Sequence, residues 1–243
     1  MKSDNVVILI TDNNYLEYTQ SMIGNLRNVG RHYGDFLVLL SEDIQDGEME
    51  KFKKRNIYTH RVSSVSYFSK LHIFSTFIRR WSRVVCLDAD YLVFKDIAPV
   101  FDQIRNGELL VDFEIYKIHQ YLTPRDKAVY DELCSWFDVD RFGFNCSCLA
   151  FDTRMIGDNT LDELLALKKK YQVINTHTCE TGGDGPIFNF KFYEQAKQLK
   201  QVGFIHDNVE DPIALHTTRW MAPWNHHRDR YDAGLEFFDK WSD

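Results

Sequence analysis

Short apolar runs that alternate with helical patterns constrain the fold of this chain more than any other feature. Residues 6–11, 35–43 and 84–87 contain brief, mostly apolar segments that end in polar residues, which is typical of strands buried on both faces. Between the first two runs, apolar residues recur at helical spacing over residues 18–29. Strands that alternate with helices predict an α/β fold with a mainly parallel central sheet covered by helices on both sides.

Weaker patterns predict further elements. We expect helices at residues 47–55, 69–81, 161–171 and 234–241, and strands at residues 58–62, 146–151 and 203–206. Residues 112–143 give no clear pattern. Because no repeat and no linker rich in Pro, Gly or Ser interrupts the chain, we expect one domain that spans residues 1–243.

Charge and cysteine content exclude several classes of protein. The chain has 29 basic and 36 acidic residues and no basic block, which argues against a nucleic-acid-binding surface or a polybasic membrane anchor. The apolar run at residues 6–10 is too short for a signal peptide or a transmembrane helix, so we expect a cytoplasmic protein without a transmembrane segment. Five cysteines without a CxxC pair argue against a disulfide framework or a zinc site.

Two carboxylates, Asp88 and Asp90, follow directly after the apolar run at residues 84–87. They could form a surface turn, because Asp commonly satisfies backbone amides there. They could also offer hard oxygen ligands to a divalent cation, since the ligands of a parallel sheet gather beyond the carboxyl ends of its strands. Asp12, which follows the first apolar run, should lie at the same edge of the sheet. An all-oxygen site suits Mg²⁺ or Mn²⁺, and an added imidazole favours Mn²⁺.

Five blocks in the same order resemble the glycosyltransferases of family 8, which include glycogenin and bacterial lipopolysaccharide glucosyl- and galactosyltransferases. The blocks are TDNNY, SKLHIFSTFIRRWSRVVCLDADYLVFKDI, FNCSCLAF, GGDGPIFN and LHTTRWMAPWN. This resemblance implies a GT-A, Rossmann-like fold. It further implies a nucleotide-binding half at residues 1–110 and a half for the donor sugar and the acceptor at residues 111–243.

The resemblance also implies roles for residues at the nucleotide end of such a site. Thr11 and Tyr15 take the positions that hold the uridine, Asp12 is a base contact, and Lys70 lies near the donor phosphates. Asp88 and Asp90 become metal ligands, and Asp88 is also shared with the ribose of the donor. In the last block His216 takes the position of the third protein ligand of the metal.

At the sugar end, the resemblance places Asn145 and Ser147 near the donor sugar. Asp184 becomes the carboxylate beside the reacting carbon, so that Asp184 and Asn145 are the catalytic candidates. Two positions depart from the family pattern. Ala222 replaces a lysine that faces the leaving diphosphate, a charge that Arg219 or Lys70 could supply, and Gly185 replaces a glutamine.

The implied activity is transfer of a hexose from a UDP-sugar, with Mn²⁺ or Mg²⁺, to an acceptor hydroxyl with retention of the anomeric configuration. The acceptor could be a carbohydrate, a protein or a lipid-linked group, and residues 112–143 could form its wall. The two departures leave open a sugar-nucleotide-binding protein without catalysis. A sugar nucleotidyltransferase fits less well, because TDNNYLEY lacks the glycines and basic residues that hold a triphosphate.

Overall fold

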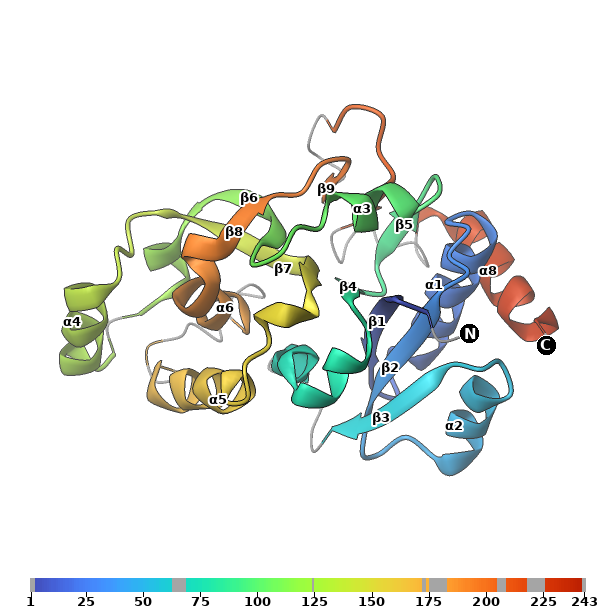
Figure 1. Ribbon diagram of the computed structural model, residues 1–243, viewed down its shortest axis with the longest axis horizontal. Helices are drawn as coiled ribbons and strands as arrows, with labels where there is room; N and C mark the ends of the chain where they lie inside the picture. The colour runs from blue at the N-terminus through green and yellow to red at the C-terminus, as the bar shows by residue number, and fades with distance from the viewer. Residues whose placement is uncertain are drawn as a thin grey trace.

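The fold is built around a seven-stranded sheet with the strand order β3-β2-β1-β4-β7-β6-β8 (Figure 1). The computed structural model describes residues 3–62, 69–123, 125–171, 174, 183–204, 209–217 and 226–241. The strands are β1 (Asn5–Thr11), β2 (Asp35–Ser41), β3 (Tyr58–Val62), β4 (Arg83–Leu87), β6 (Leu109–Lys117), β7 (Phe142–Asp152) and β8 (Ala196–Gln198).

Strands β3, β2, β1 and β4 are parallel, and β7 pairs in antiparallel fashion with both β4 and β6. The predicted α/β fold with a mainly parallel central sheet is therefore confirmed. Because β1 and β4 are adjacent and parallel, their carboxyl ends lie at one edge of the sheet. Asp12 and Asp88 share this edge, as the sequence predicts.

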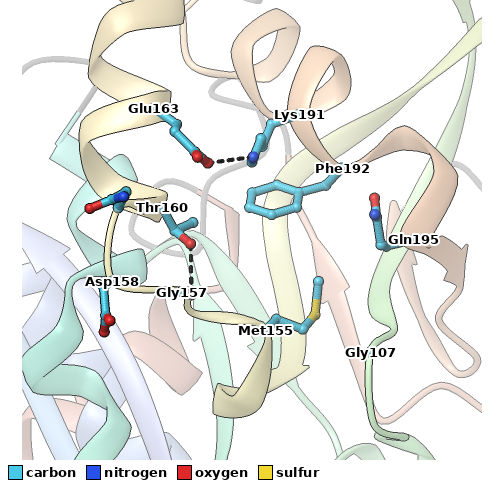
Figure 2. Close-up of a pocket in the computed structure, with 10 residues that line it drawn as sticks. Gly107, Met155, Gly157, Asp158, Thr160, Glu163, Lys191, Phe192 and Gln195 are labelled. Atoms are coloured by element: carbon cyan, nitrogen blue, oxygen red, sulfur yellow. Dashed lines mark hydrogen bonds and ion pairs between the residues drawn. The ribbon is translucent and has the colours of Figure 1, made fainter.

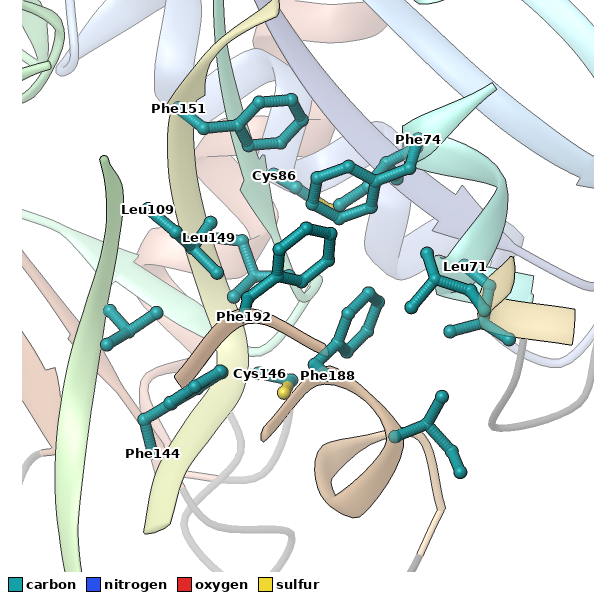
Figure 3. Close-up of a cluster of buried hydrophobic side chains, with 14 of the residues drawn as sticks. Leu71, Phe74, Cys86, Leu109, Phe144, Cys146, Leu149, Phe151, Phe188 and Phe192 are labelled. Atoms are coloured by element: carbon teal, nitrogen blue, oxygen red, sulfur yellow. The ribbon is translucent and has the colours of Figure 1, made fainter. Parts of the chain in front are cut away.

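Each central strand buries both faces. Val6 and Ile8 of β1 point into one apolar core, and Val7 and Leu9 point into another. This alternation is what a two-sided burial of a parallel sheet requires. The first core contains a stack of rings in which Phe74 lies 4.7 Å from Phe151 and 4.5 Å from Phe192, measured between ring centroids (Figure 3).

Helices cover both faces of the sheet. They are α1 (Leu16–Asn28), α2 (Asp46–Lys53), α3 (Ala98–Gln103), α4 (Lys127–Trp136), α5 (Thr160–Tyr171), α6 (Gly185–Phe192) and α8 (Arg228–Lys240). Shorter 3-10 helices are η1 (Ser69–Phe74), η2 (Thr76–Arg80), η3 (Ile118–Tyr121), η4 (Thr153–Met155) and η5 (Tyr193–Gln195). In the described ranges no helix has the length and apolar character needed to cross a bilayer.

A second, three-stranded sheet adjoins the first. Its order is β5 (Tyr91–Val93), β10 (Ala214–His216) and β9 (Val202–Phe204), with β10 antiparallel to β5 and parallel to β9. Strand β5 begins immediately after Asp90, so this small sheet brings the segment that ends at His216 beside the acidic loop. The predicted strand at 203–206 corresponds to β9, while residues 205–206 lie outside the described ranges.

The predicted α-helix at residues 69–81 is wrong. The segment forms η1 and η2, because Ser75 between them has an extended backbone with φ −70° and ψ 147°. The apolar residues that suggested a helix are still largely buried, since Leu71, Phe74, Ile78 and Trp81 are at most 2% exposed. A spacing of three or four residues suits a 3-10 helix as well as an α-helix, so the spacing alone could not separate them.

Residues 112–143, which gave no clear pattern, contain regular structure. They hold the end of β6, η3, α4 and the start of β7. Helix α4 begins at a clear signal, because the side chain of Asp126 accepts hydrogen bonds from the backbone N–H groups of Ala128 and Val129. The irregular pairing between β6 and β7 explains why their alternation was hard to recognise in the sequence.

The last helix, α8, packs against α1 at a pair of glycines (Figure 1). A Cβ atom on Gly24 would lie 1.9 Å from the carbonyl oxygen of Gly234. The contact is reinforced by Ser21 Oγ, which donates to the carbonyl of Tyr231 at 2.7 Å. The two helices therefore approach closely in the interior of α1.

We predict that Gly24→Ala destabilises the protein. The clash is with backbone, which cannot rotate aside, so the free energy of unfolding should fall by about 1–3 kcal/mol. Gly47→Ala in α2 is the matched control, because a Cβ there meets no atom within 4 Å. The control should leave stability unchanged or raise it by about 0.5 kcal/mol. Urea unfolding of both variants tests the contact, and equal stabilities would contradict it.

Candidate functional site

The site lies at the carboxyl edge of the central sheet, where β4 meets β7. The backbone N–H of Asp88 donates to the carbonyl of Ser147 at 2.9 Å, which continues the β4–β7 ladder by one residue. Asp88 therefore leaves the sheet opposite the segment Asn145–Ser147. One hydrogen bond thus joins the acidic loop to the strand on which two other candidate residues stand.

Asp88, Asp90 and His216 form a group that could hold a metal ion. One ligand atom from each side chain lies within 4.8 Å of the other two. His216 Nε2 is 3.1 Å from Asp90 Oδ1, and the backbone carbonyl of Asp90 accepts hydrogen bonds from the N–H and hydroxyl of Thr217 at 3.1 and 2.6 Å. The sequence prediction that these three side chains come together is consistent with this geometry.

The chemistry of the group fits a divalent cation. Asp90 Oδ1 is buried, and apart from His216 Nε2 at 3.1 Å it has no hydrogen-bond partner among the described residues, although a carboxylate oxygen is a strong acceptor. Two carboxylates and an imidazole are ligands that Mn²⁺ accepts. Burial lowers the pKa of His216, but the carboxylate of Asp90 more than offsets this and raises the pKa above its ordinary value.

Lys70 places a positive charge inside the same site. Its Nζ lies 2.7 Å from Asp88 Oδ1 and 3.9 Å from Asp184 Oδ2, and donates to the carbonyl of Cys146 at 2.8 Å. Burial opposes the charge on Lys70, but the carboxylates of Asp88 and Asp184 outweigh it and raise its pKa above the usual value. These contacts hold the ammonium group in place, and the side chain of Lys70 is only 11% exposed.

Asp184 immediately precedes α6, and its side chain does not cap that helix. Its Oδ2 is buried without a hydrogen-bond partner in the described ranges, although Lys70 is nearby. Burial raises the pKa of Asp184 to about 6, with the charge of Asp88 adding to the effect and that of Lys70 opposing it. A carboxylate that is poorly solvated and aimed at a cationic site is a functional candidate.

Asn189, which the sequence analysis did not single out, fixes the position of α6. Its side-chain amide donates to the carbonyl of Phe144 at 3.0 Å, and its carbonyl accepts from the N–H of Phe144 at 3.0 Å. It also donates to the carbonyl of Gly185 at 2.9 Å. The sequence did contain a signal for this residue, because Asn189 is the last residue of the block GGDGPIFN.

Asn145 and Ser147 are already bonded to protein groups. Asn145 Oδ1 accepts from the N–H of Ser147 at 2.6 Å, and Asn145 Nδ2 donates to Glu114 Oε1 at 2.8 Å. The other carboxylate oxygen of Glu114 accepts from the hydroxyl of Tyr121. Ser147 Oγ lies 2.9 Å from the hydroxyl of Tyr91. Sequence reasoning missed Glu114 and Tyr91, because no recognised block marks Glu114 and Tyr91 looked like an ordinary strand residue.

The residues assigned to the uridine lie at the end of β1. Thr11 is buried, and its hydroxyl donates to the carbonyl of Asp12 at 3.0 Å. Asp12 Oδ1 accepts from the N–H groups of Asn14 and Tyr15 at 2.9 and 3.0 Å, so this carboxylate shapes the turn before α1. Tyr15 is 45% exposed and meets Tyr18 edge-on.

Two of the predicted positions cannot be located. Arg219 and Ala222 lie outside the described residues, as does the rest of the segment 218–225. The proposed contribution of Arg219 to the site therefore stays a prediction. Lys70 and Arg219 are the two cations predicted near the donor, and of these two the described residues include Lys70.

A cavity of about 520 Å³ lies elsewhere, where β7 ends and α5 begins (Figure 2). Glu163 and Lys191 form an ion pair on its wall, and the ring of Phe192 faces it. Its lining includes none of the residues of the metal-ligand group. The large cavity and the candidate site are thus different places on the molecule.

Comparisons of sequence and of structure give different results. No protein-family model and no curated protein sequence matches this chain. Its structure resembles that of the galactosyltransferase LgtC, solved in complex with donor and acceptor sugar analogs. The TM-score is 0.68 at 13% identity, over 98% of this chain and 96% of LgtC. The chain has the GT-A fold.

Two further solved glycosyltransferases have the same fold. The bifunctional glycosyltransferase WbbM matches with a TM-score of 0.68 at 18% identity, over 99% of this chain and 50% of WbbM. GlyE of Streptococcus pneumoniae TIGR4 in its apo form matches with a TM-score of 0.64 at 18% identity, over 99% of this chain and 63% of GlyE. The GT-A fold that the sequence resemblance implied is therefore confirmed.

We predict that Asp184→Asn stabilises the protein at neutral pH. The pKa of Asp184 rises from 3.8 to about 6 on folding, so ionised Asp184 destabilises the fold. This cost is absent below about pH 4, grows as the pH rises to about 6 and is complete above it. At about pH 7.5 the gain should reach up to about 3 kcal/mol.

The measurement is chemical unfolding in EDTA at about pH 7.5 and about pH 4. Asp162→Asn is the control, because Asp162 is an exposed acidic residue in the first turn of α5. It should show no comparable gain at either pH. A gain for Asp184→Asn that is the same at both pH values would show that ionisation is not its cause.

Proposed function

We propose that this protein is a glycosyltransferase that moves a hexose from a UDP-sugar to an acceptor hydroxyl, with Mn²⁺ or Mg²⁺ and with retention of the anomeric configuration. The observation that carries the proposal is the group Asp88, Asp90 and His216 at the carboxyl edge of a GT-A sheet. Supporting it are the fold shared with LgtC, whose structure contains donor and acceptor sugar analogs, and the five sequence blocks.

In the proposed arrangement, residues 1–110 hold the nucleotide and residues 111–243 hold the sugar and the acceptor. Tyr15, which is 45% exposed, stacks on the uracil, Thr11 holds the uridine and Asp12 contacts the base. Asp88, Asp90 and His216 would hold the metal. When bound, that ion would act as a Lewis acid on the diphosphate and stabilise its negative charge.

The reaction breaks the bond between the anomeric carbon and the diphosphate oxygen, and the bonding electrons leave with UDP. Lys70 provides a positive charge beside Asp88 and so stabilises the negative charge of the leaving diphosphate. In this role it replaces the lysine that the family carries where Ala222 stands here, and Arg219 is a second candidate. The acceptor oxygen forms the new bond to the anomeric carbon and gives up its proton to the departing UDP or to solvent.

Asp184 is assigned to the sugar. It would accept hydrogen bonds from sugar hydroxyls and stabilise positive charge at the anomeric carbon, with Asn145 and Ser147 on the neighbouring strand β7. Two routes give retention, namely attack on the same face through an ion pair, or a covalent glycosyl-enzyme. Asp184 is the candidate nucleophile for the second route.

Turnover of a UDP-sugar tests the proposed function directly. Purified protein is incubated with Mn²⁺ and separately with UDP-glucose, UDP-galactose and their N-acetyl derivatives, and UDP release is measured. We expect release with at least one donor, and its loss in EDTA. If none of these UDP-sugars gave UDP release or Mn²⁺-dependent binding, the proposal would be refuted.

Asp90→Asn should abolish Mn²⁺-dependent UDP binding and leave the protein folded. The change removes a charged ligand but retains the shape of the side chain and the backbone carbonyl that Thr217 contacts. Calorimetry with UDP and Mn²⁺, together with the melting temperature, measures both properties. Asp96→Asn is the control, because Asp96 is exposed and lies outside the group. Binding by Asp90→Asn equal to that of the control would place the metal elsewhere.

One observation favours a second candidate function, a sugar-nucleotide-binding protein without catalysis. Gly185 occupies the position where the resembled family has glutamine, directly after Asp184. A Cβ atom at Gly185 would meet nothing within 4 Å, so the space where a side chain begins is open. This candidate binds UDP-sugars without transferring the sugar.

Gly185→Gln distinguishes the two candidates. Because the space is open, the variant should fold with a melting temperature close to that of the wild type. If the wild type is an enzyme, it should already release UDP, and the new side chain should change its rate. A wild type that binds UDP-sugar without turnover, and a variant that gains turnover, would establish the binding protein instead.

A further inference from the structure

The imidazole of His216 lies between two aromatic rings. In the small sheet, Tyr91 of β5 pairs directly with His216, and so does Phe204 of β9 on the other side. The ring centroids of Tyr91 and His216 are 5.1 Å apart with an interplanar angle of 33°, and those of Phe204 and His216 are 4.9 Å apart at 66°. We call this arrangement of Tyr91, His216 and Phe204 the aromatic clamp.

Among the described residues, no hydrogen bond to the second ring nitrogen fixes the orientation of this imidazole. A histidine that binds a metal usually donates its second ring N–H to a carboxylate or a carbonyl, which fixes the ring. Here Nε2 faces Asp90 Oδ1 at 3.1 Å, so Nδ1 is the second nitrogen. It is buried and has no hydrogen-bond partner among the described residues. Contacts other than a hydrogen bond at Nδ1 therefore help to hold the ring.

Tyr91 is itself well anchored. Its side chain is 3% exposed, and its hydroxyl lies 2.9 Å from Ser147 Oγ on β7 of the central sheet. Burial keeps the phenol protonated by raising its pKa well above the usual value. The phenol thus joins the small sheet, which carries His216, to the strand that receives the N–H of Asp88.

We propose that Tyr91 and Phe204 are positioning residues that hold His216 in the orientation needed to bind the metal, in place of the missing hydrogen bond at Nδ1. This inference rests on the proposed metal site. The aromatic rings restrict rotation of the imidazole through packing, and the hydroxyl of Tyr91 adds a contact with Ser147 on β7. Preorganisation of this kind raises metal affinity because less side-chain freedom is lost on binding.

The test measures Mn²⁺ affinity directly, by calorimetry and by electron paramagnetic resonance of free Mn²⁺, in the wild type and in Tyr91→Leu, Phe204→Leu and Tyr91→Phe. The two leucine variants keep apolar bulk but remove a ring, and should bind Mn²⁺ about tenfold or more weakly, the size of effect seen for outer-shell partners of metal ligands. Tyr91→Phe keeps the ring and should retain most of the affinity. Phe204 is only partly buried, so Phe204→Leu is expected to fold.

Leu92→Ala is the matched control. Leu92 follows Tyr91 on β5, is 3% exposed and pairs with Leu215 rather than His216. It should lower the melting temperature and leave Mn²⁺ affinity unchanged. An equal loss of affinity in Leu92→Ala, or unchanged affinity in both leucine variants, would overturn the clamp while leaving the metal site intact. If the wild type bound no Mn²⁺, the metal site and the clamp would both be refuted.

Discussion

The ammonium group of Lys70 is the interaction on which the candidate site depends. It is 11% exposed and lies near the carboxylates of Asp88, which follows β4, and Asp184, which precedes α6. Without a cation there, two acidic side chains would face each other in a poorly solvated space. Because 3-10 helix η1 is anchored in the core through Leu71 and Phe74, the charge is fixed before any ligand arrives.

This fixed charge defines what the site can accept. Together with a divalent cation, Lys70 would surround an anion with positive charge at one edge of a chain that is otherwise acidic overall. Burial raises the pKa of Asp184, so keeping this carboxylate ionised lowers the stability of the fold. Local destabilisation of this kind is common where a side chain serves a ligand rather than the fold. The proposed diphosphate is a ligand that would use both features.

The parallel half of the sheet could be predicted from the sequence for a simple reason. Strands such as β1 and β4 are buried on both faces, so their apolar runs are continuous and their ends are marked by Asp12 and Asp88. Parallel pairing then puts those ends at one edge. The blocks that resemble a family pointed to Asp184 and His216, which composition and periodicity alone would have left among ordinary loop and core residues.

Other parts of the site could not be predicted, since they depend on pairing between distant segments. Strands β5, β9 and β10 are three residues long each, too short for a pattern, yet they decide which rings face His216. Glu114 looked like one more charged residue, and its link to Asn145 exists only because β6 pairs with β7. The break at Ser75 between η1 and η2 is likewise invisible in apolar spacing.

Two hydrogen bonds of the Asn189 side-chain amide link α6 to Phe144 of β7, and a third contacts Gly185 within α6. Asp184 at one end of α6 and Asn145 on β7 are therefore positioned by the same side chain. A loop graft meant to change the proposed sugar selectivity would therefore have to exchange both segments together. A transplanted 183–189 loop without a matching strand would leave the backbone of Phe144 without its partner and would displace the carboxylate that the graft was meant to carry.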